Sequence, residues 1–223
     1  MVQEPGIEDG ILAYQSARFS EAFSIFERNA EGGSVEAKMW MANMLAAGQG
    51  VDSSLQRAFE YYRQAAEAGR IEAQNKVGAM LSIGQGDEQD MREGRKWLER
   101  AAGQGDVFAQ YNLASMLWKA GDSPDNLAQA AHWFEKAAAA GHYPAQARLG
   151  FMYAKGIGVE KDRVTAFVWL SLAAQHGVGN ALSVLEQTME SMSAEEKAAG
   201  AAQFEARRAG IAGISQGGPS RGL

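Results

Sequence analysis

A repeat of 36 residues constrains the fold of this chain more than any other feature of its sequence. When the sequence is shifted by this period, three kinds of marker residue superpose across four units without a gap. The markers are alanines (Ala37, Ala73, Ala109, Ala145 and Ala181), glycines (Gly33, Gly69, Gly105, Gly141 and Gly177) and aromatic residues (Tyr61, Trp97, Trp133 and Trp169). A fixed period of this length is typical of solenoids, in which each unit packs only against its neighbours.

Each unit has the pattern of two helices, named A and B in chain order. In the first unit, helix A carries apolar residues at the spacing of a helix with one buried face: Ala37, Met41, Met44 and Leu45. A G-x-G turn follows at residues 48–50, 84–86 and 156–158, where glycine takes the positive φ that ends a helix. Residues 120–124 lack this turn, so we expect a loop of different shape there. No segment alternates with the period of two that is typical of strands.

Two further recurring positions predict how the helices start and pack. Helix B is preceded by a residue suited to accept hydrogen bonds from the amides of a first helical turn: Ser54, Asp90, Asn126 and Asp162. One position inside helix A is always small, which predicts a close approach of helices: Ala42, Gly78, Ala114 and Gly150. We interpret the recurring tryptophans as packing anchors.

The repeat divides the chain into predicted segments. A disordered N-terminus (1–6) precedes an N-terminal capping helix pair (7–34), and four full repeats follow at 35–70, 71–106, 107–142 and 143–178. A partial repeat and a capping helix take residues 179–210, and a disordered tail takes 211–223. Ser193 to Glu196 have the pattern of a capping box at the start of the last helix, and Gly210 is its predicted end.

Composition excludes several classes of partner. The net charge of −6 and the pI near 5.2 argue against a nucleic-acid surface, which needs basic residues opposite the phosphates. No apolar stretch approaches membrane-spanning length, so no membrane insertion is expected. Residues 1–10 lack the basic start and apolar run of a signal peptide, which makes the cytoplasm the default expectation. The absence of cysteine leaves the compartment open, because such a chain suits either side of a membrane.

No catalytic, metal-binding or cofactor-binding residues are predicted. His132, His142 and His176 occupy unrelated repeat positions, and zinc needs three or four ligands at suitable spacings. Glu195 and Glu196 are adjacent and therefore point to different helix faces. The G-x-G turns lie between helices and recur in the repeat, whereas a dinucleotide fingerprint follows a strand.

The fourth unit carries a resemblance to a known family. Residues 145–177 read A-Q-A-R-L-G-F-M-Y-A-K-G-I-G-V-E-K-D-R-V-T-A-F-V-W-L-S-L-A-A-Q-H-G, which is similar to the Sel-one-like repeat of the tetratricopeptide-repeat superfamily. Residues 35–142 match more loosely, and the tail after residue 192 resembles the closing helix of many bacterial members. The resemblance implies an all-α, right-handed α-α superhelix that acts as a non-enzymatic adaptor or scaffold for another protein or peptide.

In related superhelices helix A lines the concave surface, so side chains there that depart from the repeat are the candidate partner-binding residues. They are Trp40, Asn43, Lys76, Asn112, Ser115, Trp118, Lys119, Arg148 and Phe151. Large rings and arginine are common in binding hot spots. With Lys155, the cations of this set form a basic lining suited to an acidic or C-terminal peptide. The alternative is that the rings fill gaps between successive A helices, and that the protein is structural or self-assembling without a peptide ligand. An enzyme is the third and weakest class.

Overall fold

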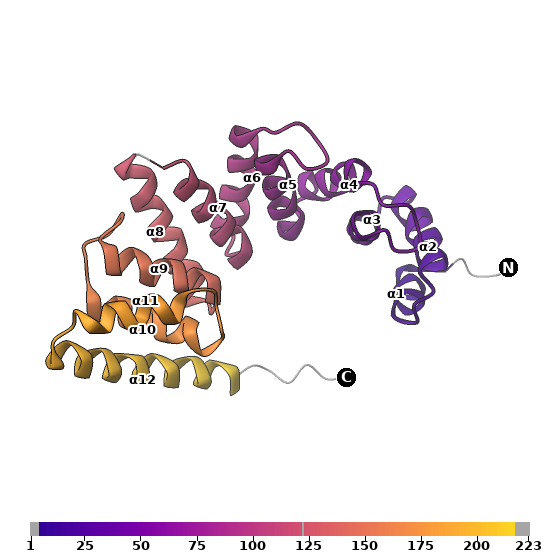
Figure 1. Cartoon of the computed structure of the whole chain (residues 1–223). Helices are drawn as coiled ribbons and strands as arrows, with labels where there is room; N and C mark the ends of the chain where they lie inside the picture. The colour runs from indigo at the N-terminus through magenta and orange to yellow at the C-terminus, as the bar shows by residue number, and fades with distance from the viewer. Residues whose placement is uncertain (1–4, 122, 217–223) are drawn as a thin grey trace. The chain divides into compact units, whose positions relative to one another are not determined.

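The computed structural model describes residues 5–121 and 123–216, and all of their regular structure is α-helical (Figure 1). The chain divides into two compact units, Met1–Asn112 and Leu113–Leu223, and the division falls within the sequence of one helix. The first unit contains α1 (Ile7–Gln15), α2 (Phe19–Glu31), α3 (Val35–Ala47), α4 (Leu55–Glu67), α5 (Ile71–Ile83), α6 (Met91–Gly103) and the start of α7 (Val107–Lys119). The second contains the rest of α7, α8 (Pro124–Ala139), α9 (Tyr143–Lys155), α10 (Arg163–Gln175), α11 (Ala181–Glu190) and α12 (Ala194–Gln216).

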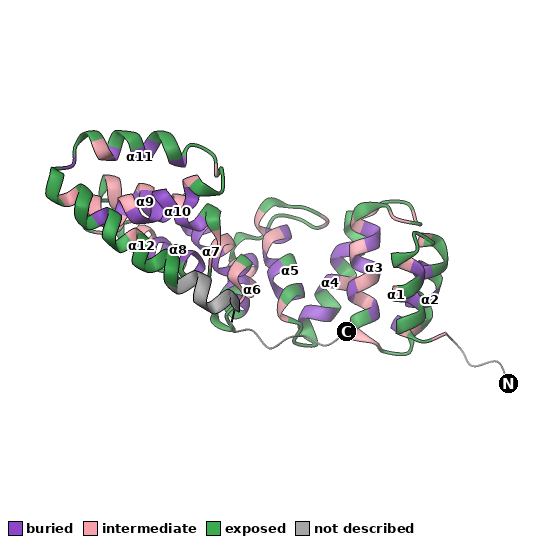
Figure 2. Cartoon of the chain, turned by 90° about the horizontal axis from the view of Figure 1, so that it is seen from below, coloured by how far each residue is buried: buried purple, intermediate pink, exposed green. Residues whose placement is uncertain are grey.

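The helices pack as consecutive pairs, which confirms the predicted all-α repeat architecture. In the first unit α1 pairs with α2, α3 with α4 and α5 with α6, and in the second unit α9 pairs with α10. The paired helices bury their apolar sides and expose their polar sides (Figure 2). Each pair thus buries one apolar stripe between its two helices and needs a neighbouring pair to cover its remaining apolar surface.

The G-x-G turn closes a repeat in two ways. Its first glycine ends helix A in the left-handed region, as Gly84 does after α5 with a φ of 67°. Its second glycine approaches the start of the preceding helix B, since a Cβ on Gly86 would lie 2.5 Å from the carbonyl oxygen of Leu55. Only glycine fits a position that combines positive φ with so close a backbone approach. The second glycine of the turn is therefore what allows one repeat to contact the preceding one so closely.

Three of the four predicted caps of helix B are confirmed, and the fourth is wrong. The side chains of Ser54, Asp90 and Asp162 accept hydrogen bonds from amides of the following first turn. In the third repeat α8 begins two residues before Asn126, at Pro124. Proline suits a first helical position because its fixed φ is already helical and its missing N–H needs no partner there.

The deepest aromatic position of helix B lies one residue after the predicted tryptophan anchors. Phe134 is fully buried, whereas Trp97 and Trp133 are half-buried and each lies under a cation three residues later, Arg100 or Lys136. Trp169 is buried, and its ring lies under the guanidinium of Arg207, 4.1 Å from the ring centroid. Trp97 and Trp133 thus have similar surroundings in the outer layer of the core, whereas Trp169 is buried and covered by a residue of α12.

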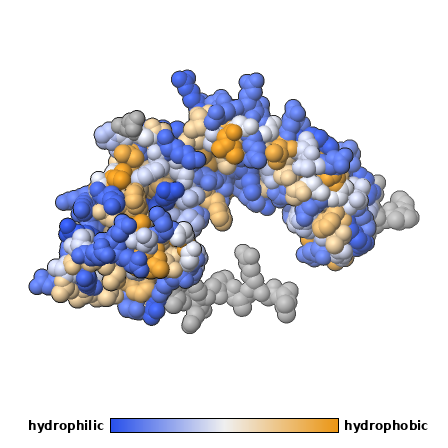
Figure 3. All heavy atoms as spheres, in the orientation of Figure 1, coloured by the Kyte–Doolittle hydropathy of each residue, from blue (hydrophilic) through white to orange (hydrophobic). Residues whose placement is uncertain are grey.

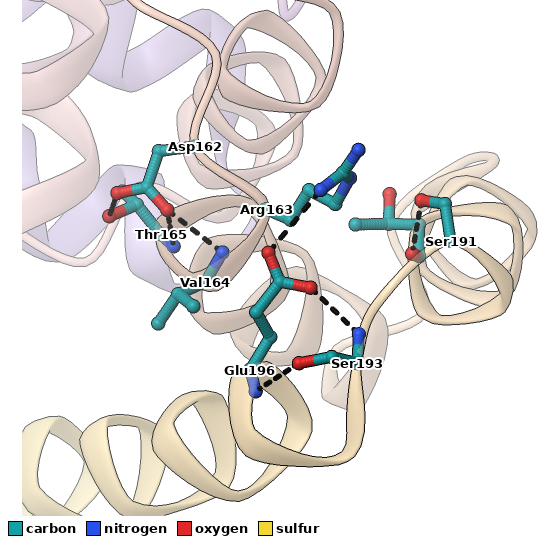
Figure 4. A network of polar contacts seen from close by, with 8 residues as sticks. Asp162, Arg163, Val164, Thr165, Ser191, Ser193 and Glu196 are labelled. Carbon is teal, nitrogen blue, oxygen red and sulfur yellow. Dashed lines mark hydrogen bonds and ion pairs between the residues drawn. The ribbon is translucent and has the colours of Figure 1, made fainter.

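The last helix is longer than predicted. Its start is as expected, since the Ser193 N–H donates to Glu196 and the Glu196 N–H donates to the Ser193 hydroxyl (Figure 4). It then continues through Gly210 to Gln216, so part of the tail expected to be disordered is helical. A glycine inside a helix costs only about 1 kcal/mol relative to alanine, which need not end it. The predicted disorder of residues 1–4 and 217–223 lies outside the described residues.

Candidate partner-binding surface

In the first unit, Trp40 is used for packing against the N-terminal helix pair. Its ring is half-buried and stacks on Phe26, with the centroids 5.3 Å apart and the planes 6° from parallel. Tyr14 lies against the same tryptophan at 5.0 Å. This position departs from the repeat because its neighbour is the atypical terminal pair. The contact is the gap-filling alternative that the sequence left open, and any binding role for Trp40 stays a prediction.

The asparagines of the first unit belong to polar pairs between helices. Asn43 Oδ1 accepts a hydrogen bond of 2.6 Å from the Tyr62 hydroxyl. Asn112 Nδ2 donates to Asn75 Oδ1 over 2.8 Å, which joins α7 to α5. Burial, together with the nearby carboxylate of Glu72, raises the pKa of Tyr62 to about 12, so this hydroxyl remains a donor at neutral pH. Lys76, on α5, is exposed.

In the second unit, five predicted residues are arranged on α7 and α9. Ser115, Trp118 and Lys119 share one side of α7, because residues three and four apart in a helix are neighbours. Arg148 and Phe151 are related in the same way on α9. Trp118 and Phe151 meet edge to face with their centroids 6.2 Å apart. We call these residues the α7–α9 surface: Ser115, Trp118, Lys119, Arg148 and Phe151.

The α7–α9 surface combines partly exposed rings with exposed cations. Trp118 and Phe151 are half-buried, and Lys119 and Arg148 are exposed. Neither cation has a carboxylate partner among the residues that the structure describes. In Figure 3, hydrophobic residues form separate patches among hydrophilic ones on the visible face. Such a surface suits a ligand that offers both apolar and acidic groups.

Sequence reasoning missed a buried glutamine that recurs with the repeat. Gln74, Gln110 and Gln146 are all buried, and each donates to the carbonyl of the residue eight positions earlier, at the end of the preceding helix B. The spacing of 36 residues between these glutamines is visible in the sequence. Because glutamine is mostly exposed in proteins, its identity alone gives no sign of burial.

Sequence reasoning also missed a cavity lined by cationic side chains. The sequence pattern places Lys155 in the basic lining of helix A, but in the structure it lies with Lys161 and Arg163 around a cavity beside α11. Lys161 lies in the turn and Arg163 at the start of helix B. The sequence pattern points to binding only at helix A residues that depart from the repeat, so it does not include them. Aligning the turn residues of the four repeats with one another could have found them.

The three histidines each have a local structural role. The Nδ1 atom of His142 accepts a hydrogen bond from the Ala145 N–H and so caps α9, and burial lowers the pKa of this imidazole. His176 stacks on Tyr143 at 3.6 Å, and His132 contacts Trp133 edge to face. Within residues 5–121 and 123–216, no three His, Cys, Asp or Glu side chains gather in a way that could hold a metal ion. None of the helices described there is both long and apolar enough to cross a membrane.

Solved structures with the same fold come from several bacteria. A Sel1 repeat protein from Oxalobacter formigenes is 28% identical, with a TM-score of 0.73 over 82% of this chain and 74% of that one. A protective antigen present in uropathogenic Escherichia coli strains, which displays the same type of repeat fold, is 21% identical, with a TM-score of 0.54. That match covers 92% of this chain but 53% of the antigen. No match is found among curated proteins.

A family model gives the more specific result, because it matches the sequence in four consecutive stretches. These are residues 35–69, 71–106, 107–142 and 144–178, which together make up more than half of the chain. Each stretch contains one helix A, its turn and one helix B as the structure has them. The chain therefore belongs to the Sel1 repeat family.

Proposed function

We propose that this protein is a non-enzymatic interaction scaffold that binds an acidic segment of a partner protein on the α7–α9 surface. The observation that carries the proposal is the contact between Trp118 and Phe151, flanked by the exposed side chains of Lys119 and Arg148. Aromatic rings and arginine are the side chains that most often dominate binding energies at protein interfaces. Membership of a family of helical repeats, which commonly serve as interaction scaffolds, supports the same conclusion.

The α7–α9 surface differs from the surroundings of the half-buried tryptophans on helix B in how its cations are used. At Trp97 and Trp133 the neighbouring cation belongs to the same helix as the tryptophan and lies over the face of its ring. Arg148 is exposed, lies on a different helix from Trp118, and has no carboxylate partner among the described residues. An acidic partner segment would supply that carboxylate, while its apolar side chains would cover the rings.

A structural or self-assembling role is the second candidate, and exposed leucines favour it. Leu12 on α1 and Leu182 on α11 are 57% and 58% exposed, although the other apolar residues of these helices are buried or half-buried. Association through these helices would cover them. Light scattering over a concentration series tests this candidate, because assembly predicts a mass that rises with concentration and falls in a Leu12→Ser/Leu182→Ser variant.

Affinity capture followed by direct titration tests the scaffold proposal. Wild-type protein, a Lys119→Glu/Arg148→Glu variant and a Lys96→Glu/Lys197→Glu control are compared as baits in extract from the source cell. Lys96 and Lys197 are exposed on α6 and α12, so the control has the same net charge as the test variant. We expect one partner to be captured by wild type and control only, and the purified partner to bind the test variant at least tenfold more weakly. Equal capture by all three baits would contradict the proposal.

A further inference from the structure

A small cavity lies where the end of α9 and the start of α10 meet α11. Its volume is about 110 Å³, several times the roughly 30 Å³ that one water molecule takes in the liquid. Three cationic side chains line it from the α9–α10 side, and three polar side chains line it from α11 and the residue that follows this helix. These six residues are Lys155, Lys161 and Arg163, and Gln187, Thr188 and Ser191. All of them belong to the second unit.

Only the fourth repeat has a cation at all three positions. The corresponding residues are Ala47, Ser53 and Leu55 in the first repeat, Ile83, Gln89 and Met91 in the second, and Lys119, Asp125 and Leu127 in the third. The turn itself is the same in the second and fourth repeats, since Gly84 and Gly156 both end helix A in the left-handed region. The backbone therefore accepts neutral residues at all three places, and packing does not require the positive charges.

The turn brings the cations together. A Cβ on Gly156 would lie 3.2 Å from the Cβ of Lys161, which shows how closely the turn folds back on the end of α9. Lys155 precedes that glycine, so the two lysines lie on neighbouring segments of the turn. Arg163 is the first residue of α10, where the helix dipole disfavours a positive charge. All three side chains line the same cavity, and Lys155 and Lys161 are exposed.

The carboxylates near the cavity neutralise one of the three cations. Arg163 NH1 lies 3.3 Å from Glu196, and Glu196 also accepts from the Ser193 N–H (Figure 4). Asp162 is turned to its own helix, where it accepts from the amides of Val164 and Thr165. Neither Lys155 nor Lys161 has a carboxylate partner in the described part of the chain. Lys155, Lys161, Arg163 and Glu196 together carry a net charge of about +2 at neutral pH; Asp162 is not counted, because its carboxylate faces its own helix.

The hydroxyls on the α11 side of the cavity are not available to a ligand, so the donors are the charged side chains and the Gln187 amide. The Ser191 hydroxyl donates to the Thr188 carbonyl, and the Thr188 hydroxyl donates to the Val184 carbonyl, so both protons are already used. Arg163 Nε is buried and has no hydrogen-bond partner among the described residues. Figure 4 shows the Arg163 side chain between Glu196 and the end of α11 at Ser191. A buried N–H without an acceptor is costly, and an anion in the cavity would supply one.

We propose that this cavity is a binding site for a phosphate group, held by Lys155, Lys161 and Arg163. A phosphate group carries about −1.5 to −2 charges at pH 7 and offers three strong acceptor oxygens, which matches the net charge and the unused donors. Hydrogen bonds between such cations and phosphate oxygens are among the strongest in proteins. The site lies on other residues than the α7–α9 surface, so it goes beyond the scaffold proposal and is tested without any protein partner.

Titration calorimetry with inorganic phosphate at constant ionic strength tests the site. The test variant is Lys155→Ile/Lys161→Gln, which introduces the residues of the second repeat and should therefore keep the fold. The control is Lys96→Gln/Lys197→Gln, which removes the same charge from exposed positions outside the cavity. We expect saturable binding to wild type and control, and binding at least tenfold weaker to the test variant. If thermal unfolding shows that the double variant is not folded, Lys161→Ser, with the residue of the first repeat, takes its place.

Further titrants identify the source of the phosphate. A phosphoserine peptide that binds more tightly than inorganic phosphate, and more tightly than its unphosphorylated form, would support the site and indicate a phosphorylated protein. Inorganic phosphate that binds as tightly as the peptide would support the site and indicate a small ion. The absence of saturable phosphate binding to wild type, an equal loss in the control, or acetate binding as strong as phosphate would overturn the proposal.

Discussion

Gly150 in α9 and Leu170 in α10 pack so closely that a Cβ on residue 150 would lie 2.7 Å from Leu170 Cγ and 3.0 Å from its backbone nitrogen. The second repeat has the same arrangement, since a Cβ on Gly78 would lie 2.7 Å from Leu98 Cγ. This contact explains why one position of helix A is always small. It also allows the two helices of a pair to approach more closely than larger side chains would permit.

The variant Gly150→Ala should lower the free energy of unfolding by about 1–3 kcal/mol, as overpacked cores usually do. This loss would outweigh the gain of roughly 1 kcal/mol that alanine brings to a helix. Gly103→Ala is the control, because a Cβ on that helical glycine would have nothing within 4 Å. Urea unfolding followed by circular dichroism should show the control as stable as wild type or more so. Equal stability of both variants would contradict the packing account.

The burial of the aromatic side chains in helix B predicts which alanine variant loses more stability, and this order differs from the one that the sequence suggests. Phe134→Ala should cost about 3–5 kcal/mol, because this ring is fully buried. Trp133→Ala should cost less, since the half-buried indole keeps one face toward Lys136. Chemical unfolding of the two variants measures both effects. A larger loss for Trp133→Ala would mean that the tryptophan is the principal anchor after all.

His142 makes stability depend on pH in a predictable direction. Its Nδ1 accepts the Ala145 N–H only when the ring is neutral, and burial lowers the pKa of this histidine in the folded protein. A group whose pKa is lowered by folding contributes stability above its unfolded pKa, about 6.5 for histidine, and loses it as pH falls through the folded value. Wild type should therefore lose more stability between pH 7 and pH 5 than His142→Asn, which keeps a capping side chain without titrating there. Parallel pH profiles of the two proteins would contradict this assignment.

The cap of α12 should control the order of that helix. Ser193→Ala removes the acceptor of the Glu196 N–H and should destabilise the helix start by about 0.5–2 kcal/mol. Hydrogen exchange of amides in the first turn of α12 should accelerate. Glu195→Gln, an exposed neighbour outside the capping box, should change exchange much less. Equal acceleration in both variants would show that the box does not anchor the helix.

Most of the fold could be predicted from the sequence because the repeat samples the same environment four times. A position such as Gly78 or Gly150 is informative only because its equivalents are also small. The errors lie where that comparison was missing or misleading. Pro124 moved the start of α8 because a strong local preference replaced the repeat pattern. The predicted end of the last helix at Gly210 is wrong, since the helix runs to Gln216. The chain has no equivalent helix with which this end could be compared.

The candidate sites were harder to predict, because a departure from the repeat has two physical causes. Trp40 departs because it stacks on Phe26 of the terminal helix pair, which is a packing reason. Arg148 departs while remaining exposed, which packing does not explain. Sequence spacing places both on the same side of helix A and cannot separate them. Burial and ring contacts do separate them.

Photo-crosslinking in the source cell tests the central claim most directly. A photoreactive residue in place of Lys119 reports on the α7–α9 surface, and one in place of Glu135, exposed on α8, reports on a different side of the same unit. The scaffold account predicts one crosslinked partner protein from position 119, lost when Arg148→Glu is added, and none from position 135. The same adducts from both positions, or adducts unaffected by Arg148→Glu, would contradict it.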